Sequence, residues 1–570
     1  MSMRRIQESS SASSATQTGQ TSIETRPAPR ATARTHAERT TAERTRQQAL
    51  TAATSADKAA ALTHKAPANR GAVDLYAWQN KDPQQDGVEG TRTDRAYAEL
   101  GVRTGVKPVI VAVIDSGVDI DHEDLQGRLW SNAGEIPGNG IDDDHNGYPD
   151  DVHGWNFLGT RGADGRPVNI DRVPLVITRE LGRLEQLAAS RDLTPTERQQ
   201  LDDVRAAVER RRSGLVNAMT SYSSLREQVL ATMRAVDEGK ADASQRAVSR
   251  EALEAALARY DAELAELAGQ LGSYVNPGFD PRAKILGDDP FDFGDRFYGN
   301  SDVEGPDAMH GTHVAGIIAA VRGNGLGIDG IANDVRIMAI RAVPDGDEYD
   351  KDVANAVRYA VDNGADIINM SFGKPYSPGK DAVDAAFRYA AKKGVLVVHA
   401  AGNDHSDNDR APNYPARYTG MARHRPLPNW IEVGASSAQG GQALPAQFSN
   451  YGAKTVDLFA PGVQIPSTIP QQNGYAELSG TSMAAPTVTG VAALILSQFP
   501  ALRGAELRSL LLESARRRPD LMVRKPTGRP QDAELVPFGS LSITGAIVDA
   551  YEALQLAQVR YGAGKEQASV

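Results

Sequence analysis

The chain has 570 residues, of which 40% are hydrophobic, and it carries a formal net charge of −11. This hydrophobic content is enough to bury a large core, whereas the negative charge argues against a nucleic-acid-binding role for the whole molecule. The chain has no cysteine, which excludes disulfides, and no apolar stretch approaches the length of a membrane span.

The first segment, residues 1–70, is rich in Ser, Thr, Ala and Arg and is expected to be disordered. Residues 1–30 lack the apolar core of a secretory signal, so the sequence as written predicts no signal peptide. Two interpretations of the location stay open. Either the protein is intracellular, or it is exported and its signal has been removed.

A buried strand is predicted at 109–114, where six apolar and mostly β-branched residues follow one another. The run ends at Asp115-Ser116-Gly117. This places a carboxylate at the carboxyl edge of a parallel sheet, where ligands bind in open α/β proteins. Asp115 is therefore a candidate active-site acid.

The segment from Glu135 to Asp151 carries six carboxylates and no Lys or Arg. Their mutual repulsion is tolerable if a cation neutralises it, and the spacing matches that of a calcium loop. The predicted ligands are Asp142, Asp144, Asn146, the carbonyl of Tyr148, Asp150 and Asp151. The loop is no EF-hand, because its twelfth position is His153 and Asp151 has to supply the closing carboxylate. A solvated acidic turn without metal is the alternative.

Residues 172–274 have the pattern of long amphipathic helices. Thr194-Pro195-Thr196-Glu197 is a capping box with proline at the first helical position, and Ser249 is predicted to cap a third helix. We predict an antiparallel helical insertion, either a coiled-coil hairpin or a small bundle. Its apolar stripe is interpreted as internal packing, with a groove for a protein partner as the alternative.

His310 opens a second chemically informative stretch, His310-Gly311-Thr312-His313, followed by a small-residue helix from Val314 to Val321. Beyond it, strands and helices alternate, which predicts an α/β fold with a mostly parallel sheet covered by helices on both faces. The predicted strands are 335–340, 366–370 and 394–400, and the predicted helices are 353–363, 380–392 and a closing helix at 541–557.

Gly480-Thr481-Ser482 precedes the apolar run Val488 to Leu496, which is interpreted as a buried helix with Pro486 in its first turn. Ser482 then lies at a helix N-terminus, where free backbone N–H groups can stabilise an oxyanion. Because serine alone is a poor nucleophile, the interpretation requires a base and an orienting acid. His310 and Asp115 are the upstream candidates.

Five segments, VIVAVIDSGVDIDHEDL, HGTHVAGIIAA, INMSFG, AAGN and GTSMAAP, resemble those of the subtilisin-like serine peptidases, the subtilases, and occur in the same order. With the text between them they cover roughly 95–160 and 285–555. The resemblance implies a three-layer αβα fold and a triad of Asp115, His310 and Ser482.

The resemblance also implies further site residues. Asn403 is expected to donate its side-chain amide to the oxyanion, beside the backbone N–H of the nucleophile. Ser371-Phe372-Gly373 is expected to pair with an extended peptide, and Ala401-Gly402 to line the substrate site next to it. Asp404 either favours a basic substrate residue or is an exposed turn carboxylate.

As for function, the resemblance implies a serine endopeptidase acting on proteins or peptides, with structural Ca²⁺, no cofactor in the chemistry, and a secreted or periplasmic location. Asp115 and His310 are 195 positions apart here, against a few tens in compact subtilases, so the insertion has to loop out. A substrate-selective processing peptidase, a peptide cyclase or ligase, and a protein-binding scaffold that acts through the insertion remain as alternatives.

The predicted organisation follows from these features. It comprises a disordered segment at 1–70, the first part of the catalytic domain at 71–171, the helical insertion at 172–274, the second part of the catalytic domain at 275–560, and a loose tail at 561–570.

Overall fold

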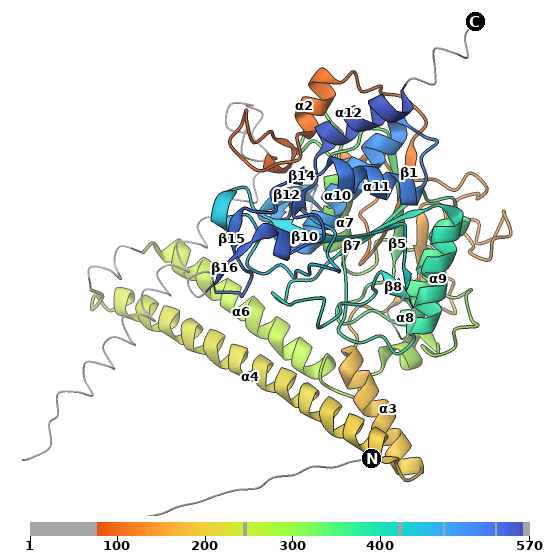
Figure 1. The fold of residues 1–570 in the computed structure, drawn as a ribbon. Helices are drawn as coiled ribbons and strands as arrows, with labels where there is room; N and C mark the ends of the chain where they lie inside the picture. The colour runs from red at the N-terminus through yellow and green to blue at the C-terminus, as the bar shows by residue number, and fades with distance from the viewer. Residues whose placement is uncertain are drawn as a thin grey trace, which may run out of the picture.

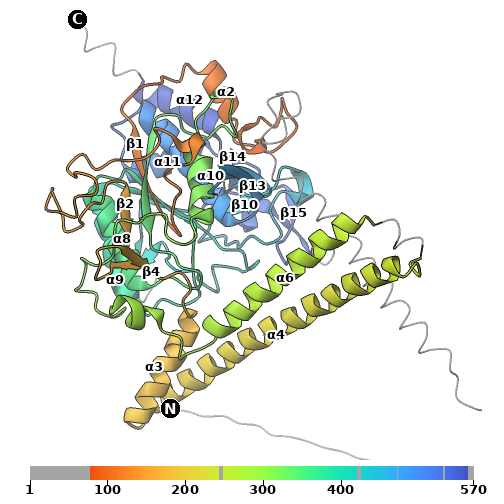
Figure 2. The same cartoon turned by 180° about the vertical axis from the view of Figure 1, so that it is seen from behind.

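The computed structural model describes residues 77–562, apart from 243–244, 246–247, 420–424, 471–472 and 530–532. The expected disorder at 1–70 and nearly all of the expected tail lie outside the described residues. Figure 1 shows a layered α/β body from which a pair of long helices extends, and Figure 2 shows the same arrangement from behind.

A nine-stranded sheet forms the centre of the body, in the order β14-β17-β11-β10-β7-β6-β1-β5-β2. Neighbouring strands run parallel, except for the edge pair β14 and β17. The predicted mostly parallel sheet is thus confirmed. The strands are β1 (Val109–Asp115), β2 (Gly154–Asn156), β5 (Val335–Arg341), β6 (Ile367–Met370), β7 (Leu396–Ala400), β10 (Trp430–Ser436), β11 (Leu458–Pro461), β14 (Arg516–Arg517) and β17 (Ala546–Ile547).

Four antiparallel two-stranded ribbons surround this sheet. They are β3 (Gly159–Arg161) with β4 (Pro167–Asn169), β8 (Tyr418–Thr419) with β9 (Arg425–Pro426), β12 (Ile465–Ile469) with β13 (Gly474–Leu478), and β15 (Met522–Arg524) with β16 (Leu535–Pro537).

Helices cover both faces of the sheet, and β1 shows why. Val111 and Val113 belong to one hydrophobic core, whereas Ala112 and Ile114 belong to the other. A strand that is buried on both faces has to be apolar at every position, as 109–114 is. The first face carries α7 (Met309–Ala319), α10 (Thr481–Gln498), α11 (Gly504–Ser514) and α12 (Ala550–Tyr561), with α2 (Thr93–Glu99) beside α12, and the second face carries α8 (Asp350–Asp362) and α9 (Lys380–Lys393).

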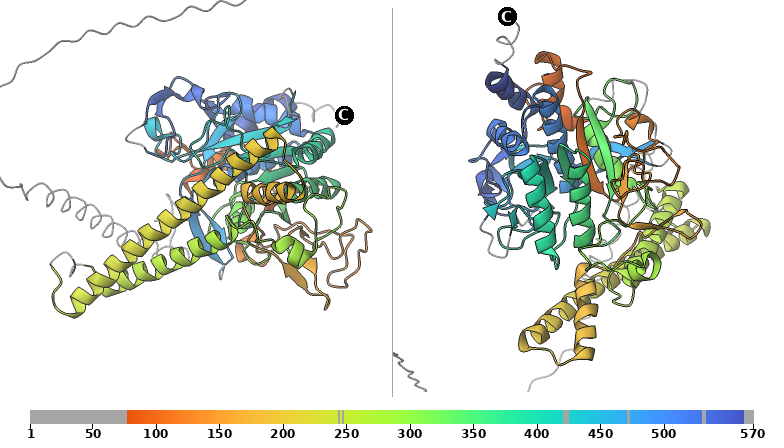
Figure 3. Two further views of the ribbon diagram at one scale, coloured as in Figure 1. Left: turned by 90° about the horizontal axis from the view of Figure 1, so that it is seen from below. Right: turned by 90° about the vertical axis from the view of Figure 1, so that its right-hand side faces the viewer.

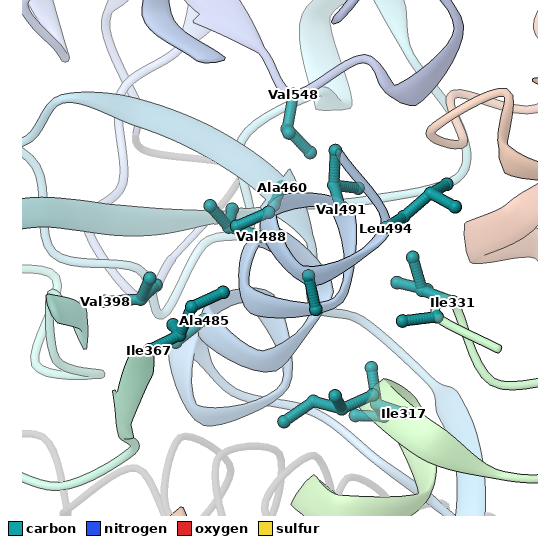
Figure 4. Packing of buried hydrophobic residues seen from close by; sticks show 14 of the residues in the cluster. Ile317, Ile331, Ile367, Val398, Ala460, Ala485, Val488, Val491, Leu494 and Val548 are labelled. Atoms are coloured by element: carbon teal, nitrogen blue, oxygen red, sulfur yellow. The ribbon is translucent and has the colours of Figure 1, made fainter. Parts of the chain in front are cut away.

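The helix α10 runs through the middle of the first core, and Figure 4 shows its side chains from close by. Val488 and Val491 are fully buried, among residues from the sheet and from α7 that include Ile367, Val398 and Ile317. A helix that is apolar on all sides has to be enclosed, which is the position that the run 488–496 predicts.

Between β4 and α7, the described part of the chain forms three α-helices: α3 (Val176–Ser190), α4 (Pro195–Asp237) and α6 (Arg250–Ser273). The predicted caps are confirmed, since Thr194 forms a capping box with Glu197 and the Ser249 side chain accepts from the backbone N–H of Ala252. The division into helices differs from the prediction, because 195–237 is one continuous helix of 43 residues. The first of the three helices, α3, lies before the predicted cap at Thr194.

The helices α4 and α6 form an antiparallel hairpin that projects from the body, as Figure 3 shows from two further sides. Val229 packs with Leu253 and Tyr260 in one cluster along the pair, while Leu215 and Leu271 belong to a second cluster, which also contains residues of α3. The apolar stripe is therefore used within the hairpin itself, which favours the internal-packing interpretation.

Three element boundaries differ from the predicted ones. The helix α7 starts at Met309, so His310 lies in its first turn, and α10 starts at Thr481, so Pro486 lies inside the helix instead of in its first turn. The closing helix begins at Ala550, because the Asp549 side chain caps it by accepting from the N–H of Glu552.

Candidate active site

The predicted site residues gather at one edge of the central sheet. Asp115 ends β1, Ser371 follows β6 and Ala401 follows β7, and these three strands are parallel neighbours. Carboxyl ends of parallel strands share one edge, so segments far apart in the sequence meet there. His310 and Ser482 approach from the first turns of α7 and α10, which pack together on one face of the sheet.

Asp115 and His310 are in direct contact. The Nδ1 atom of His310 lies 2.6 Å from Oδ1 of Asp115, and the same oxygen accepts from the backbone N–H of Ser116 at 2.8 Å. Asp115 is 1% exposed, whereas the His310 side chain is 37% exposed. The carboxylate thus holds a proton on Nδ1 and leaves Nε2 free to act as a base.

The charge of Asp115 also changes the basicity of His310. Burial disfavours the imidazolium, but the attraction and hydrogen bond of the Asp115 carboxylate outweigh that effect and raise the pKa of His310 above its ordinary value. The charge of Asp307 raises the pKa of His310 further, by a smaller amount.

Gly311 allows this contact to form. A Cβ atom at Gly311 would lie 2.0 Å from the carbonyl oxygen of Gly117 and 3.1 Å from Cβ of Asp115. Any larger residue would push α7 away from the end of β1, so glycine directly after His310 sets the distance between base and acid.

Ser482 is half-buried and bonds to Ser371 in both directions. Its hydroxyl donates to the carbonyl of Ser371 at 3.1 Å, and the hydroxyl of Ser371 donates to the carbonyl of Ser482 at 2.9 Å. Pro486, four residues on, has no N–H to offer the Ser482 carbonyl, which is why this acceptor is open to Ser371. Among the described residues, Ser482 makes no hydrogen bond to His310.

Asn403 is held with its amide group near the nucleophile. Its Oδ1 accepts from the backbone N–H of Thr481 at 2.9 Å and from the Thr481 hydroxyl at 3.0 Å, which turns Nδ2 outward. A Cβ atom built on Gly480 would lie 3.5 Å from both Nδ2 of Asn403 and the backbone N of Ser482. Two N–H donors thus border one small space, and Asn403 itself is exposed to solvent.

Thr481 is a further residue of the candidate site, to which the sequence interpretation gave no role. It fixes the orientation of Asn403, and its hydroxyl also accepts from the N–H of Gly402 at 3.1 Å. The sequence feature that could have identified Thr481 is its position directly before Ser482 in Gly480-Thr481-Ser482.

Ser371-Phe372-Gly373 continues beyond the end of β6, and Asn369 donates to the Ser371 hydroxyl at 3.0 Å. Ala401 has no exposed surface, and its carbonyl accepts from the amide groups of Asn408 and Asn450 at 2.8 and 3.0 Å. Of the predicted pair Ala401-Gly402, only the glycine retains surface for a ligand, and Ala401 serves to fix the turn.

His313, three positions after His310, is buried and directed elsewhere. Its Nε2 lies 3.0 Å from the carbonyl oxygen of Ala476, and burial lowers its pKa to about 3. The His313 ring is thus bonded to β13 instead of to Asp115 or Ser482.

In the acidic loop, three carboxylates converge: Glu135, Asp144 and Asp151 offer oxygens that lie within 4.8 Å of one another. Asn132 donates to Asp144 at 2.9 Å and to Asp151 at 2.6 Å, and Asn146 bonds to the same two residues. Asp144, Asn146 and Asp151 were predicted as ligands, whereas Glu135 was not, although it opens the acidic run.

The other predicted ligands have different partners. The Asp142 carboxylate accepts from the backbone N–H groups of Asn146 and Gly147, and Asp150 accepts from Asn139 and Gly140 and pairs with Arg161 at 3.3 Å. The Tyr148 ring is buried, and its hydroxyl donates to the carbonyl of Arg296. Asp142 and Asp150 lie outside the group of converging carboxylates, which contains Glu135 instead. Glu135 also accepts from the loop backbone, from the N–H groups of Asp143, Asp144 and Asp150.

The cluster of Glu135, Asp144 and Asp151 suits a hard cation. Asp151 is fully buried, and burial raises its pKa to about 6, with the neighbouring Asp144 charge acting in the same direction. Within the described part of the chain, none of the three carboxylates pairs with a lysine or arginine. A metal with oxygen ligands would neutralise them, so the residues present fit such a group.

The chain is similar in sequence to proteins of one family. The model of the subtilase family matches residues 107–530 of the chain. The thermophilic serine proteinase of Bacillus sp. (strain AK1) is 42% identical over 226 residues, which are 40% of this chain and 50% of that protein. Subtilisin DY of Bacillus licheniformis is 38% identical over 234 residues, 41% of this chain and 77% of that protein.

A solved structure of a cold adapted subtilisin-like serine proteinase is 34% identical, with a TM-score of 0.32 over 40% of this chain and 73% of that chain. Coverage of the relatives is incomplete, and the chain spans only half the length of the Bacillus AK1 proteinase.

Proposed function

The chain belongs to the subtilase family, and from this membership we propose that it is a serine endopeptidase that hydrolyses peptide bonds through an acyl-enzyme. The observation that carries the proposal is the 2.6 Å contact between His310 and Asp115 at the sheet edge to which Ser482 and Asn403 also contribute. A buried acid, an oriented base, a hydroxyl at a helix N-terminus and an amide donor are what acyl transfer requires.

In the proposed reaction, Nε2 of His310 takes the proton of the Ser482 hydroxyl as its oxygen attacks the scissile carbonyl. Asp115 stabilises the imidazolium that forms, and His310 then gives the proton to the leaving amine. Water attacks the resulting ester by the same route in reverse. Before the first step, the Ser482 hydroxyl has to turn from the Ser371 carbonyl toward His310.

The oxyanion of each tetrahedral intermediate is proposed to bind between Nδ2 of Asn403 and the backbone N–H of Ser482. Thr481 supports this role, because it holds Oδ1 of Asn403 and leaves the amide hydrogens for the oxyanion. Substrate main chain is proposed to pair with Ser371-Phe372-Gly373, which recognises peptide backbone and therefore favours broad specificity.

The raised pKa of His310 predicts the pH dependence of the reaction. The base has to be neutral, so kcat/KM is expected to rise with pH through an apparent pKa above 6.5, the ordinary value for histidine. Removing the charge of Asp115 is expected to shift this acid limb to lower pH. A profile of kcat/KM from pH 5 to 9 measures both, and an acid limb below the ordinary value would contradict the assigned pair.

We also propose that the cluster of Glu135, Asp144 and Asp151 holds a structural calcium ion, with Asn146 near it. The ion would neutralise the carboxylates and pin the loop, with no part in bond cleavage.

Chelation is expected to lower the melting temperature by several degrees. A bound ion adds about 2.7 kcal/mol to the free energy of unfolding when its free concentration is about a hundred times its Kd. Differential scanning fluorimetry in calcium and in EDTA measures the shift. Asp151→Asn should abolish the difference, whereas the loop variant Asp164→Asn, at an exposed position away from the cluster, should retain it. Equal melting temperatures in calcium and EDTA would remove the calcium proposal.

The division of the chain into a segment at 1–70, a catalytic domain from 71–171 and 275–560, and a helical insertion at 172–274 is likewise proposed. In the described part of the chain, no helix combines the length and hydropathy needed to cross a bilayer. Export to the periplasm or medium is proposed from family membership alone.

The first test of the function is reaction of the purified chain with a serine-directed fluorophosphonate, followed by intact mass measurement. One adduct on the wild type and none on Ser482→Ala is the expected result. Folded protein that forms no adduct would contradict an assembled nucleophile and favour the scaffold alternative, in which the helical insertion binds a protein partner.

A further inference from the structure

A second histidine–carboxylate pair, His399 and Glu432, is buried beneath the proposed substrate-binding segment. His399 is 0% exposed in β7, and Glu432 is 4% exposed at the directly opposite position of β10. The reaction proposed above uses neither residue. Two titratable groups that are almost completely removed from water are costly to bury unless each finds strong partners.

Both nitrogens of the His399 ring have such partners. Nε2 lies 2.8 Å from the carbonyl oxygen of Phe372, and Nδ1 lies 3.0 Å from each carboxylate oxygen of Glu432. A carbonyl can only accept, so the Nε2 atom has to carry a hydrogen. Glu432 is oriented in turn by Trp430, whose indole N–H donates to Oε2 at 2.8 Å.

The contact between Glu432 and Nδ1 of His399 also determines that the other ring nitrogen, Nε2, carries a hydrogen. Burial raises the pKa of Glu432, while His399 and Trp430 favour its carboxylate form. Whether the proton between Nδ1 and Glu432 lies on the nitrogen or on the oxygen, Nε2 keeps its hydrogen and remains a donor to Phe372. The contact is therefore maintained in either arrangement.

The Phe372 carbonyl needs this donor because it lies beyond the sheet. The strand β6 ends at Met370, which is paired with His399 in β7, so strand pairing no longer positions the next residues. Ser371 is fixed by Ser482, and Lys374 exchanges two backbone hydrogen bonds with Tyr414, at 2.9 and 2.8 Å. Between these two anchors, Phe372 is held through its carbonyl by His399.

We propose that His399 is a positioning residue for substrate binding, which holds Ser371-Phe372-Gly373 in the extended form that an incoming peptide strand pairs with, and that Glu432 keeps its ring in the donor state. This inference rests on the proposed function. It concerns recognition of peptide main chain and leaves the chemistry at Ser482 to the triad.

The test compares a substrate that needs this segment with a reagent that does not. One readout is kcat and KM for a peptide with several residues on the acyl side, and the other is the rate of labelling by a fluorophosphonate without a peptide. For His399→Leu we expect a tenfold to hundredfold loss of kcat/KM on the peptide, mainly through KM, and labelling within about threefold of wild type.

Conservative variants separate positioning from simple loss of stability. The amide of His399→Gln can donate to Phe372 and should restore most of the peptide activity. Glu432→Gln can donate to Nδ1, so that the hydrogen stays on Nε2 and peptide activity is retained. Glu432→Leu should lose peptide activity, and it provides an independent test if His399→Leu does not fold. Val397→Ala, on the same face of β7, should lower the melting temperature without a selective loss on the peptide.

Several results would overturn the inference. They are equal losses in the peptide and labelling readouts, unchanged KM in His399→Leu, or Gln variants as impaired as the Leu variants. A wild type that forms no adduct contradicts the proposed function and this inference with it, whereas a labelled wild type with any of these results contradicts the inference alone.

Discussion

Ser482→Ala is expected to reduce the rate of peptide hydrolysis by about 10⁶-fold, the size of effect that removing a nucleophile has in serine peptidases of this family. The fold should survive, because the lost hydroxyl makes one hydrogen bond, to the Ser371 carbonyl, at a half-buried position. The backbone carbonyl that accepts from Ser371 is unchanged by the substitution. The variant should still hydrolyse the peptide faster than water alone does, because substrate binding and oxyanion stabilisation remain.

Steady-state hydrolysis of a chromogenic peptide, together with a thermal melt, measures both expectations. Ser479→Ala is a suitable control, since Ser479 is exposed, lies three positions earlier and, among the described residues, accepts from the N–H of Gln464 alone. Activity of Ser482→Ala within tenfold of wild type would show that another group is the nucleophile.

Asp115→Asn is the second change with a large expected effect, a loss of about 10⁴-fold in kcat. The substitution replaces an acceptor of the Nδ1 hydrogen by an amide that can donate to Nδ1. His310 would then carry its hydrogen on Nε2, and the ring could not take the hydroxyl proton of Ser482 through that atom. The shape of the side chain changes little, so the buried packing around the end of β1 should remain.

The matched control is Asp121→Asn, which alters an exposed carboxylate in the same segment. It should keep kcat within about twofold of wild type, because Asp121 is exposed beyond the end of β1 and the carboxylate bonded to His310 is that of Asp115. If the two variants lost activity equally, the orienting acid would have to be assigned elsewhere.

The central features of the site were predictable because each is encoded locally. Asp115 follows an apolar run that only a doubly buried strand explains, and Ser482 precedes a run that only an enclosed helix explains. Strand ends and helix starts of a parallel sheet meet at one edge, so the order of the motifs already indicated that the residues would meet.

The acidic loop was only partly predictable. Asp144 and Asp151, two of the predicted ligands, converge with Glu135, which lies outside the spacing of a calcium loop, whereas Asp142 does not join them. Both Glu135 and Asp142 also accept from backbone N–H groups of the loop. A carboxylate can serve as a ligand or as a turn cap at the same spacing, and only the folded path of the chain decides between them.

Element boundaries depended on contacts that the pattern of apolar residues does not contain. The helix α10 extends past Pro486 toward its N-terminus because Ser371 satisfies the carbonyl that proline leaves open. Asp549 ends the irregular stretch before α12, and its spacing to Glu552 is a capping signal that could have been noticed. His399 and Glu432, in contrast, are paired only by the register of two strands.

The distribution of the site over the chain has a kinetic consequence. Asp115 and His310 are 195 positions apart, with the hairpin between them, and Ser482 comes from a third, later segment. Contacts between residues so far apart in the sequence form slowly, because the entropy of closing a long loop is lost before the contacts provide any stabilising free energy. A partly folded chain therefore lacks the assembled site, and under the proposed function a newly made chain would cleave no peptide until Asp115, His310 and Ser482 have come together.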